Sequence, residues 1–454
     1  MTEPQLRRLL DRAAEVPVPP DPWLVIRRRG HRLRRVRLAV AVTGTAAVAA
    51  VGISVPRLMV SQPVTSAAPR PSSADIISLA HGTWRSIPAP PSAAIQDAVM
   101  VWTGQELVIW GGSGWTAYLP AGGLRAGYAY QPATGRWQSL PAAPISADGT
   151  PEGVWTGTDV VVAASYGGHL RLAAYRPATG TWRRLPAPPV AGLSASEYRL
   201  IWTGRQLLLY GYPPETSAQA GNPFQPGPRP VLAALTADGS RWRILTAPPS
   251  RPQNTLDQGF TAVWSGSRLL VFTQRMHSDQ TADGFSLTGG GSTVASYDPL
   301  TNTWITEPVT GPAPPLNGTA FWTGQAALLV GGVECTVCSG GPAGARYPLS
   351  GGVFDPATGS WHALTPPPAL NVMPDAVAWA GALIAVANAN QFPAQPNQSA
   401  VAGAWDPDTG QWLRLSAPPV SIQGGGVSPV TGVWTGQEFI IPGSTSLAAF
   451  VPAS

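Results

Sequence analysis

From about residue 80 onward, the chain alternates short apolar runs with turn residues. The first unit contains the runs DAVMVW (97–102), ELVIW (106–110), AGYAY (126–130) and RWQSLP (136–141). Thr-Gly, Gly-Gly and Pro-Ala-Thr-Gly sequences bound these runs of five or six residues. Short apolar runs between such residues are typical of antiparallel strands joined by turns. The pattern therefore predicts four strands in this unit.

The unit repeats seven times along the chain. A Trp followed by a small residue and Gly opens each repeat, at Trp102, Trp155, Trp202, Trp264, Trp322, Trp379 and Trp434. A second Trp precedes a Pro-rich stretch, at Trp84, Trp137, Trp182, Trp242, Trp304, Trp361 and Trp412. One four-stranded sheet cannot bury both of its faces alone, so such repeats stack radially. We predict an all-β fold, a seven-bladed β-propeller over residues 80–454.

The two ends of the repeat region complement one another. The last repeat begins at Trp434 and ends near Phe450, where a third strand is expected, and has no fourth strand. Trp84, in GTWRSIP, belongs to a fourth strand that no first, second or third strand precedes. We therefore predict that the N-terminal strand completes the last blade and closes the ring.

The spacing resembles that of kelch repeats. Each has a hydrophobic strand, a Gly pair, and then a Tyr and a Trp with six residues between them, as at Tyr130 and Trp137. The Gly pair is complete only at Gly111–Gly112 and Gly331–Gly332. The resemblance implies a kelch-type propeller similar to the galactose oxidase group. Most kelch propellers bind other proteins and a few relatives are enzymes, but no functional residue can be transferred to this chain.

The N-terminal segment differs from the repeats in charge. All 29 basic residues are Arg, and ten of them lie in residues 1–37 beside four acids, a net charge of +6. The other 417 residues carry 19 Arg and 20 acids, a net charge of −1. A nucleic-acid-binding body needs a basic face of its own. We therefore expect no nucleic acid among the partners.

An uncharged run follows this basic tail. Residues 38–55 read LAVAVTGTAAVAAVGISV, and 18 residues of helix span ~27 Å, about the thickness of a bilayer core. We predict a transmembrane helix at 38–58, with residues 1–37 cytoplasmic and the propeller extracytoplasmic. Residues 59–79, rich in Pro, Ser and Ala, are interpreted as a spacer. The alternative is a cleaved signal peptide, including a twin-Arg type at Arg34–Arg35.

The order of tail, span and propeller resembles that of membrane-anchored kelch-repeat proteins of actinobacteria. The absence of Lys beside abundant Arg, Ala, Gly and Pro also fits a high-GC genome. In the tail, Leu6, Leu9 and Leu10 have helical spacing, which predicts a short helix that could bind a cytoplasmic partner. The alternative is a basic segment that lies on anionic lipid and sets the orientation.

The predicted topology separates two faces of the propeller. Turns from first to second strand and from third to fourth share one face, the tight-turn face. The other connections share the opposite face, the long-loop face, where the loops after the second strand vary most in length. The long ones are expected near 113–126, 212–230, 274–293, 333–350 and 389–401. Loops on a rigid scaffold are common sites of binding.

Aromatic and basic residues in these loops are the first candidates for ligand contact. They are Trp115, Tyr118, Phe224, Arg275, His277, Arg346 and Tyr347, together with Phe285 and Phe392. Such residues suit sugar stacking or a protein hot spot. The alternative is that they hold the long loops against the blades.

Acidic residues at the channel mouth are the second candidates. Asp97, Glu197 and Asp375 lie four or five residues before the Trp that opens their repeats. A polar ring there could bind a cation or a sugar, or it could only solvate the strand ends.

The two cysteines, Cys335 and Cys338, lie in GGVECTVCSGG of the fifth long loop. We expect a local disulfide in an oxidising exterior; a redox pair and half of a zinc site are the alternatives.

Enzyme signatures are scarce, since the five histidines are scattered and no phosphate loop, zinc motif or nucleophile motif occurs. Galactose oxidase chemistry needs a Tyr–Cys cross-link beside His ligands, which these cysteines do not favour. We expect no catalytic residue, cofactor or metal. The leading hypothesis is a membrane-anchored module that binds a protein or a cell-envelope glycan on its long-loop face. The alternatives are a glycan-active enzyme with a channel-mouth site, and a transmembrane sensor whose residues 1–37 bind a cytoplasmic regulator such as a sigma factor.

Overall fold

The computed structural model describes residues 73–90, 98–112, 125–166, 169–190, 193, 198–213, 229–249, 255–281, 284–310, 319–331, 334–335, 345–346, 351–365, 376–387, 401–419, 430–443 and 446–453. All of them belong to the second of two compact units, residues 52–454. The predicted tail, transmembrane segment and most of the spacer lie outside the described residues. Among the described residues, no helix has the length and apolar character needed to cross a membrane.

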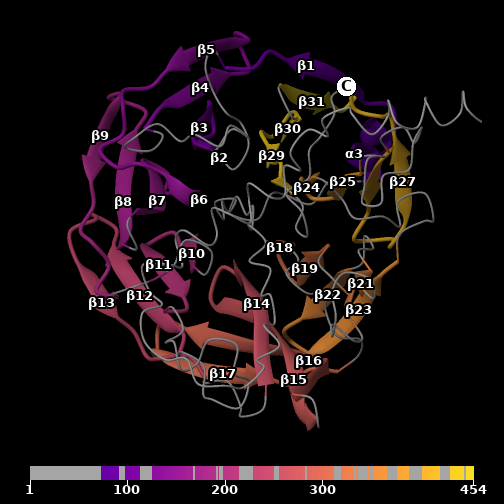
Figure 1. The fold of residues 1–454 in the computed structure, drawn as a ribbon. Coiled ribbons are helices and arrows are strands. Elements are labelled where there is room, and N and C mark those ends of the chain that lie inside the picture. The colour runs from indigo at the N-terminus through magenta and orange to yellow at the C-terminus, as the bar shows by residue number, and fades with distance from the viewer. Residues whose placement is uncertain are drawn as a thin grey trace, which may run out of the picture. The chain divides into compact units, whose positions relative to one another are not determined.

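Seven sheets are arranged around a common centre, so the predicted seven-bladed propeller is confirmed (Figure 1). Blade 1 contains β2 (Ala98–Trp102), β3 (Leu107–Gly111), β4 (Gly127–Gln131) and β5 (Arg136–Ser139). Blade 2 contains β6 (Asp148–Trp155), β7 (Val160–Tyr166), β8 (His169–Arg176) and β9 (Thr181–Arg184). Blade 3 contains β10 (Tyr198–Trp202), β11 (Gln206–Gly211), β12 (Val231–Thr236) and β13 (Trp242–Ile244). Blade 4 contains β14 (Thr255–Trp264), β15 (Leu269–Thr281), β16 (Gly284–Asp298) and β17 (Thr303–Glu307). Blade 5 contains β18 (Thr319–Trp322), β19 (Ala327–Val330), β22 (Gly351–Asp355) and β23 (Ser360–Leu364).

Blade 6 contains β24 (Ala376–Trp379), β25 (Leu383–Ala387), β26 (Val401–Trp405) and β27 (Trp412–Leu415). Blade 7 contains β29 (Val433–Trp434), β30 (Phe439–Pro442), β31 (Leu447–Val451) and, as its fourth strand, β1 (Thr83–Ile87). β1 pairs antiparallel with β31, with Trp84 opposite Phe450. The prediction that the N-terminal strand closes the ring is therefore confirmed.

The first strand of blade 7 is interrupted at Gly432. β28 (Val430–Thr431) lies before it and pairs parallel with β24 of blade 6, while β29 lies after it and pairs within blade 7. The Gly432 amide donates to the Val377 carbonyl at 2.8 Å. A Cβ at Gly432 would lie 2.1 Å from Cε2 of Phe439, so only glycine lets the chain pass this ring.

The helix α3 (Ser73–Ala80) precedes the closing strand, where the sequence analysis expected spacer. Leu79 is buried and Ile76 partly buried against the apolar cluster of blades 6 and 7. These two residues are three positions apart and therefore share one helix face. Packing of that face explains why a segment with spacer-like composition is helical.

The core consists of apolar layers between neighbouring blades. Between blades 1 and 2, for example, Val99 and Val101 pack with Val160 and Val162. Near the circumference, indole nitrogens connect adjacent blades, because the fourth-strand Trp donates to a carbonyl just after the fourth strand of the preceding blade. These bonds are Trp84 to Ser416 (2.8 Å), Trp137 to Pro88 (2.8 Å), Trp182 to Pro141 (3.0 Å), Trp242 to Pro186 (2.8 Å) and Trp304 to Thr246 (2.9 Å).

The structure confirms tight turns on one face. In all seven blades, the glycine between first and second strand has a positive φ of 85–101°, a conformation that suits glycine: Gly104, Gly157, Gly204, Gly266, Gly324, Gly381 and Gly436. The third-to-fourth-strand turns of blades 1, 2, 3, 5 and 6 use glycine similarly, and that of blade 4 has Asn302 with φ 56°. The chain enters through α3 and leaves after β31 on this same face, and the Ala453 amide donates to the Ser78 carbonyl at 2.9 Å.

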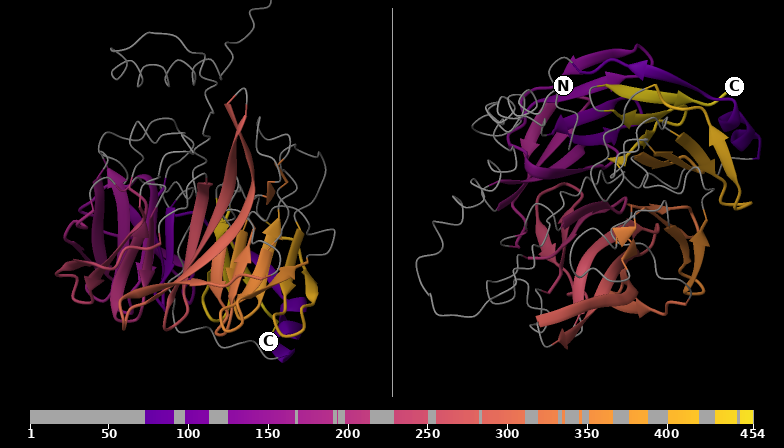
Figure 2. Two further views of the ribbon diagram at one scale, coloured as in Figure 1. Left: turned by 90° about the horizontal axis from the view of Figure 1, so that it is seen from below. Right: turned by 45° about the vertical axis from the view of Figure 1, so that its right-hand side comes forward.

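The fourth-blade connection differs from the expected loop at 274–293. β15 continues to Thr281 and β16 begins at Gly284, so the two strands form a long ribbon. This ribbon extends beyond the strand ends of the other blades on the long-loop side (Figure 2). The segment QRMHSDQT lacks Gly and Pro, and this composition permits a strand to continue where the length of the connection suggested a loop.

Candidate functional site

Most of the predicted site residues lie outside the described residues. These are Trp115, Tyr118, Phe224, Tyr347, Asp97, Glu197, Asp375 and Cys338, along with Phe392. The channel-mouth ring and the disulfide therefore stay predictions.

The predicted residues whose backbone is described come from two different blades. Arg275 and His277 are two positions apart in β15 of blade 4, opposite Asp257 and Thr255 of β14. Arg346 lies in β21 (Ala345–Arg346), which pairs with β20 (Glu334–Cys335) within the fifth-blade connection.

In that small ladder, Arg346 is opposite Glu334 and Cys335 is opposite Ala345. The described backbone therefore puts a basic and an acidic position opposite one another in a ribbon that also holds one predicted cysteine.

A buried ion pair lies on the innermost strands, where the sequence analysis did not expect one. Glu152 of β6 and Arg199 of β10 approach to 3.4 Å between Oε1 and Nη1, and their side chains are 5% and 7% exposed. Arg199 also donates to the Tyr198 carbonyl at 2.7 Å. Its guanidinium carbon lies 5.3 Å from the centre of the Phe260 ring on β14. One side chain thus contacts the inner strands of blades 2, 3 and 4.

These residues occupy equivalent positions in the first strands of their blades, and we call this set of positions the polar level of the inner strands. Glu152 and Arg199 each lie three residues before the Trp that ends their strand. The same position in other blades holds the buried residues Thr261, Thr319 and Thr431. The Oγ1 atoms of Thr319 and Thr431 are buried without a hydrogen-bond partner. In the described residues of this level, polar groups therefore come from blades 2, 3, 4, 5 and 7.

Tyr198 adds a fixed hydroxyl beside the ion pair. Its Oη donates to the Ala163 carbonyl at 3.1 Å within the layer between blades 2 and 3. Burial, followed by the nearby Glu152 carboxylate, raises the pKa of Tyr198 well above its usual range. The phenol therefore stays protonated, and it acts as a hydrogen-bond donor rather than as a base.

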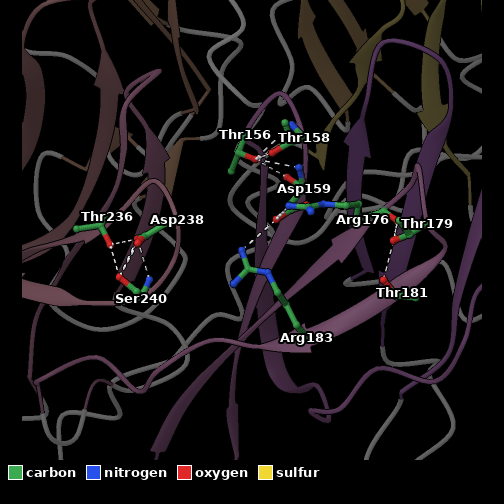
Figure 3. Close-up of polar contacts among 10 residues, drawn as sticks. All are labelled: Thr156, Thr158, Asp159, Arg176, Thr179, Thr181, Arg183, Thr236, Asp238 and Ser240. Carbon is green, nitrogen blue, oxygen red and sulfur yellow. Dashed lines mark hydrogen bonds and ion pairs between the residues drawn. The ribbon is translucent and has the colours of Figure 1, made fainter.

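A second set of charged groups lies on the tight-turn face. Asp159, in the turn between β6 and β7, accepts from Arg176 Nε at 2.7 Å and from Arg183 Nη2 at 3.0 Å (Figure 3). The Asp159 side chain is 5% exposed, whereas the two arginines are about half exposed. The hydrogen bond to Asp159 raises the pKa of Arg176. This cluster ties the inner turn of blade 2 to its two outer strands.

Blade 7 repeats this arrangement across the closure. Glu438 occupies the turn position equivalent to Asp159, and Arg85 of β1 donates to both of its oxygens, at 2.6 Å and 2.8 Å. Burial opposes the charge of Arg85, but hydrogen bonds with Tyr130 and Glu438 raise its pKa. Blade 1 differs in this respect. Its equivalent acid is Glu106, and the residue after its fourth-strand Trp is Gln138, where blades 2 and 7 have Arg. Burial raises the pKa of Glu106.

A third polar group is local to one turn. Asp238, between β12 and β13, accepts hydrogen bonds from Thr236 and Ser240 (Figure 3). These bonds lower its pKa from 3.8 to about 2. These donors all come from the turn itself.

The described side chains form an ion-pair network and a buried polar level. Among them, no group of three or more His, Cys, Asp or Glu could hold a metal ion. Glu152 and Arg199 were not predicted, because the predicted acids lie one or two positions further from the Trp of their repeats. The available signal was a charged residue three positions before the Trp that ends each of these two strands.

No protein-family model matches this chain, and no curated protein matches it either. The class that the fold defines is the seven-bladed β-propeller, closed by its N-terminal strand.

Proposed function

We propose that this protein is a membrane-anchored, extracytoplasmic binding module whose long-loop face contacts a protein or a cell-envelope glycan. The observation that carries the proposal is the position at which the chain enters and leaves the propeller. Both α3 and the end of β31 lie on the tight-turn face, joined by the bond between Ala453 and Ser78. A tether that enters on this face leaves the long-loop face free.

The kelch assignment is part of this proposal. The tilted contacts between the third-strand aromatic and the fourth-strand Trp support it, as in Tyr130–Trp137, Tyr175–Trp182 and Tyr297–Trp304, with ring centres 5.0–5.2 Å apart. A kelch-type propeller similar to the galactose oxidase group would present its variable connections on one face. The proposal transfers no active site from that group.

The anchor is proposed from the sequence, with residues 38–58 as the span and residues 1–37 in the cytoplasm. Single-cysteine variants of the full chain test it, made in a Cys335→Ser, Cys338→Ser background. Ser240→Cys, on an exposed turn, should react with a membrane-impermeant maleimide on intact cells. Thr2→Cys should react only after lysis. Labelling of Ser240→Cys only after lysis, or a mature chain that lacks residue 2, would overturn the anchored orientation.

A transmembrane sensor is the main alternative. Cross-linking in cells, with mass spectrometry, compares the full chain with a variant that lacks residues 2–20. Partners retained by both chains support the binding module. Partners lost with the tail favour a sensor that binds a cytoplasmic regulator. The described residues supply no observation that favours the alternative of a glycan-active enzyme.

A further inference from the structure

The ribbon of blade 4 carries a strand edge that is open in the part of the chain that the structure describes. β16 pairs with β15 along most of its length, but β17 pairs only with Val294–Asp298. The preceding ten residues of β16, Gly284 to Thr293, have no partner strand on their outer side among the described residues. The main-chain groups that point outward along such an edge can bind another strand.

The composition of this edge contrasts with that of the other outer edges. Six of the seven outermost strands carry a charged residue: Arg85, Arg136, Arg183 with Arg184, Arg243, Glu307 and Arg414. Charges on an edge discourage pairing with other chains. The run GFSLTGGGST has no charged residue and no Pro. This edge therefore lacks the charge that six of the seven outermost strands carry.

Two register shifts mark the base of the ribbon. One lies between Asp257 and Gly259 of β14, and the other between Gln274 and Met276 of β15. Gly259 has φ 141°, a conformation that favours glycine. β-Bulges bend a strand and redirect it. The register shifts therefore occur where the ribbon leaves the body of blade 4.

The register also divides the ribbon into two faces. Met276 is opposite Leu256, while Leu287 and Phe285 are opposite Ser278 and Gln280, at positions of the same parity. The alternate positions hold polar residues, including His277 opposite Thr288 and Asp279 opposite Ser286. Along the edge strand β16, Phe285 and Leu287 therefore alternate with Ser286 and Thr288. A strand that extended this ribbon would match it with alternating apolar and polar residues.

We propose that the outer edge of β16, residues 284–293, binds an extended, alternating apolar and polar segment of a partner protein by strand addition. The inference rests on the proposed function, because it names the partner class for the long-loop face. Two identical edges related by a twofold axis can pair only antiparallel. Copies tethered at their tight-turn faces in one membrane would point their ribbons the same way. The tether therefore favours a different protein over a second copy.

Site-specific photo-cross-linking in cells that produce the full chain tests this proposal. The cross-linker is placed at Ser286 or Thr288 on the open edge, at His169 on the long-loop side of blade 2, or at Thr303 on the charged edge of β17. We expect adducts from Ser286 and Thr288 on one segment of one partner, two residues apart, and none from Thr303. A two-residue step is the signature of a paired strand.

Charge on the edge provides a second readout. Ser286→Lys with Thr288→Lys should reduce the yield of the partner adduct formed from His169 at least tenfold. The matched pair Thr303→Lys with Ile305→Lys adds equal charge to the same blade and should leave the yield unchanged. Thermal unfolding of both double variants checks that each one keeps its fold.

Other outcomes separate the two proposals. Adducts from Ser286 to a second copy of this chain would overturn the choice of partner. Adducts from His169 without any from Ser286 would overturn strand addition and leave the proposed function standing. No adduct from either position would count against both.

Discussion

The indole nitrogen of Trp84 donates a hydrogen bond of 2.8 Å to the carbonyl of Ser416, a residue 332 positions away in the sequence. This bond joins the N-terminal strand of blade 7 to the end of blade 6. It repeats a contact that four other fourth-strand tryptophans make with their preceding blades. The closure thus uses the same inter-blade contact as the continuous parts of the ring.

Two tryptophans test the value of this contact. Trp182 donates to Pro141 at 3.0 Å, whereas Trp361 Nε1 is buried without a partner. The path of the chain after β17 explains the difference. There the Thr310 amide donates to the Gly359 carbonyl, and the Trp361 amide donates to the Thr310 carbonyl.

Trp182→Phe should cost about 0.5–1.5 kcal/mol more than the loss of ring area alone, because a hydrogen bond is lost. Trp361→Phe should lack that extra cost. Chemical denaturation of both variants measures the difference, and a larger loss for Trp361→Phe after correction for buried area would contradict it.

The buried pair of Glu152 and Arg199 should show strong coupling. Arg199→Met leaves a buried carboxylate without its cation and should destabilise the fold by about 3–5 kcal/mol. Glu152→Met with Arg199→Met removes both charges and should restore much of this loss. A double-mutant cycle by denaturant unfolding measures the coupling, and additive losses would show that the two groups do not act as a pair.

The closing ion pair should matter less than its geometry suggests. Arg85 is 39% exposed and Glu438 is 8% exposed, so solvent screens part of the attraction. Arg85→Met should lower the free energy of unfolding by about 1–2 kcal/mol, with the loss reduced in high salt. Arg414→Met is the comparison variant on an outer strand; an equal effect there would mean that closure is not specifically involved.

Asp238 should titrate far below an ordinary aspartate. Its folded pKa of about 2 lies below the model-peptide value of 3.8, so its contribution to stability is present above pH 3.8. That contribution is lost as the pH falls through about 2. Carbon-13 NMR of the carboxyl group measures the midpoint.

Thr236→Val removes the largest cause of this shift and should move the midpoint towards 3.8. Thr181→Val, on an exposed strand of blade 2, should leave it unchanged. An unchanged midpoint in Thr236→Val would contradict the assigned cause.

The fold was predictable because the repeat is visible in single residues. The seven Trp-x-Gly turns fixed the strand order, and the unmatched Trp84 and Phe450 predicted the closure that the structure confirms. Two details depended on tertiary contacts. The end of the predicted spacer is helical because Ile76 and Leu79 pack against the propeller. The first strand of blade 7 is divided at Gly432, where the ring of Phe439 lies close to the backbone.

The candidate site was less accessible from the sequence. Arg275 and His277 were assigned to a loop because the second-strand connection is long, but pairing with β14 makes a strand of that segment. Glu152 and Arg199 escaped notice because each is a single charge in its own repeat. Only the side-by-side placement of β6 and β10 makes them a pair. The acids at the channel mouth stay a prediction.

The pairing of β1 with β31 also bears on the order in which the chain is made. β1 is synthesised before the other blade strands, and its partner β31 is synthesised after them. Until β31 has been made, β1 lacks the strand with which it pairs in the closed ring. A chain cut short before residue 447 lacks every residue that pairs with β1. The ring therefore closes only after β31 has been made, and its last blade is assembled from the earliest and the latest of the blade strands.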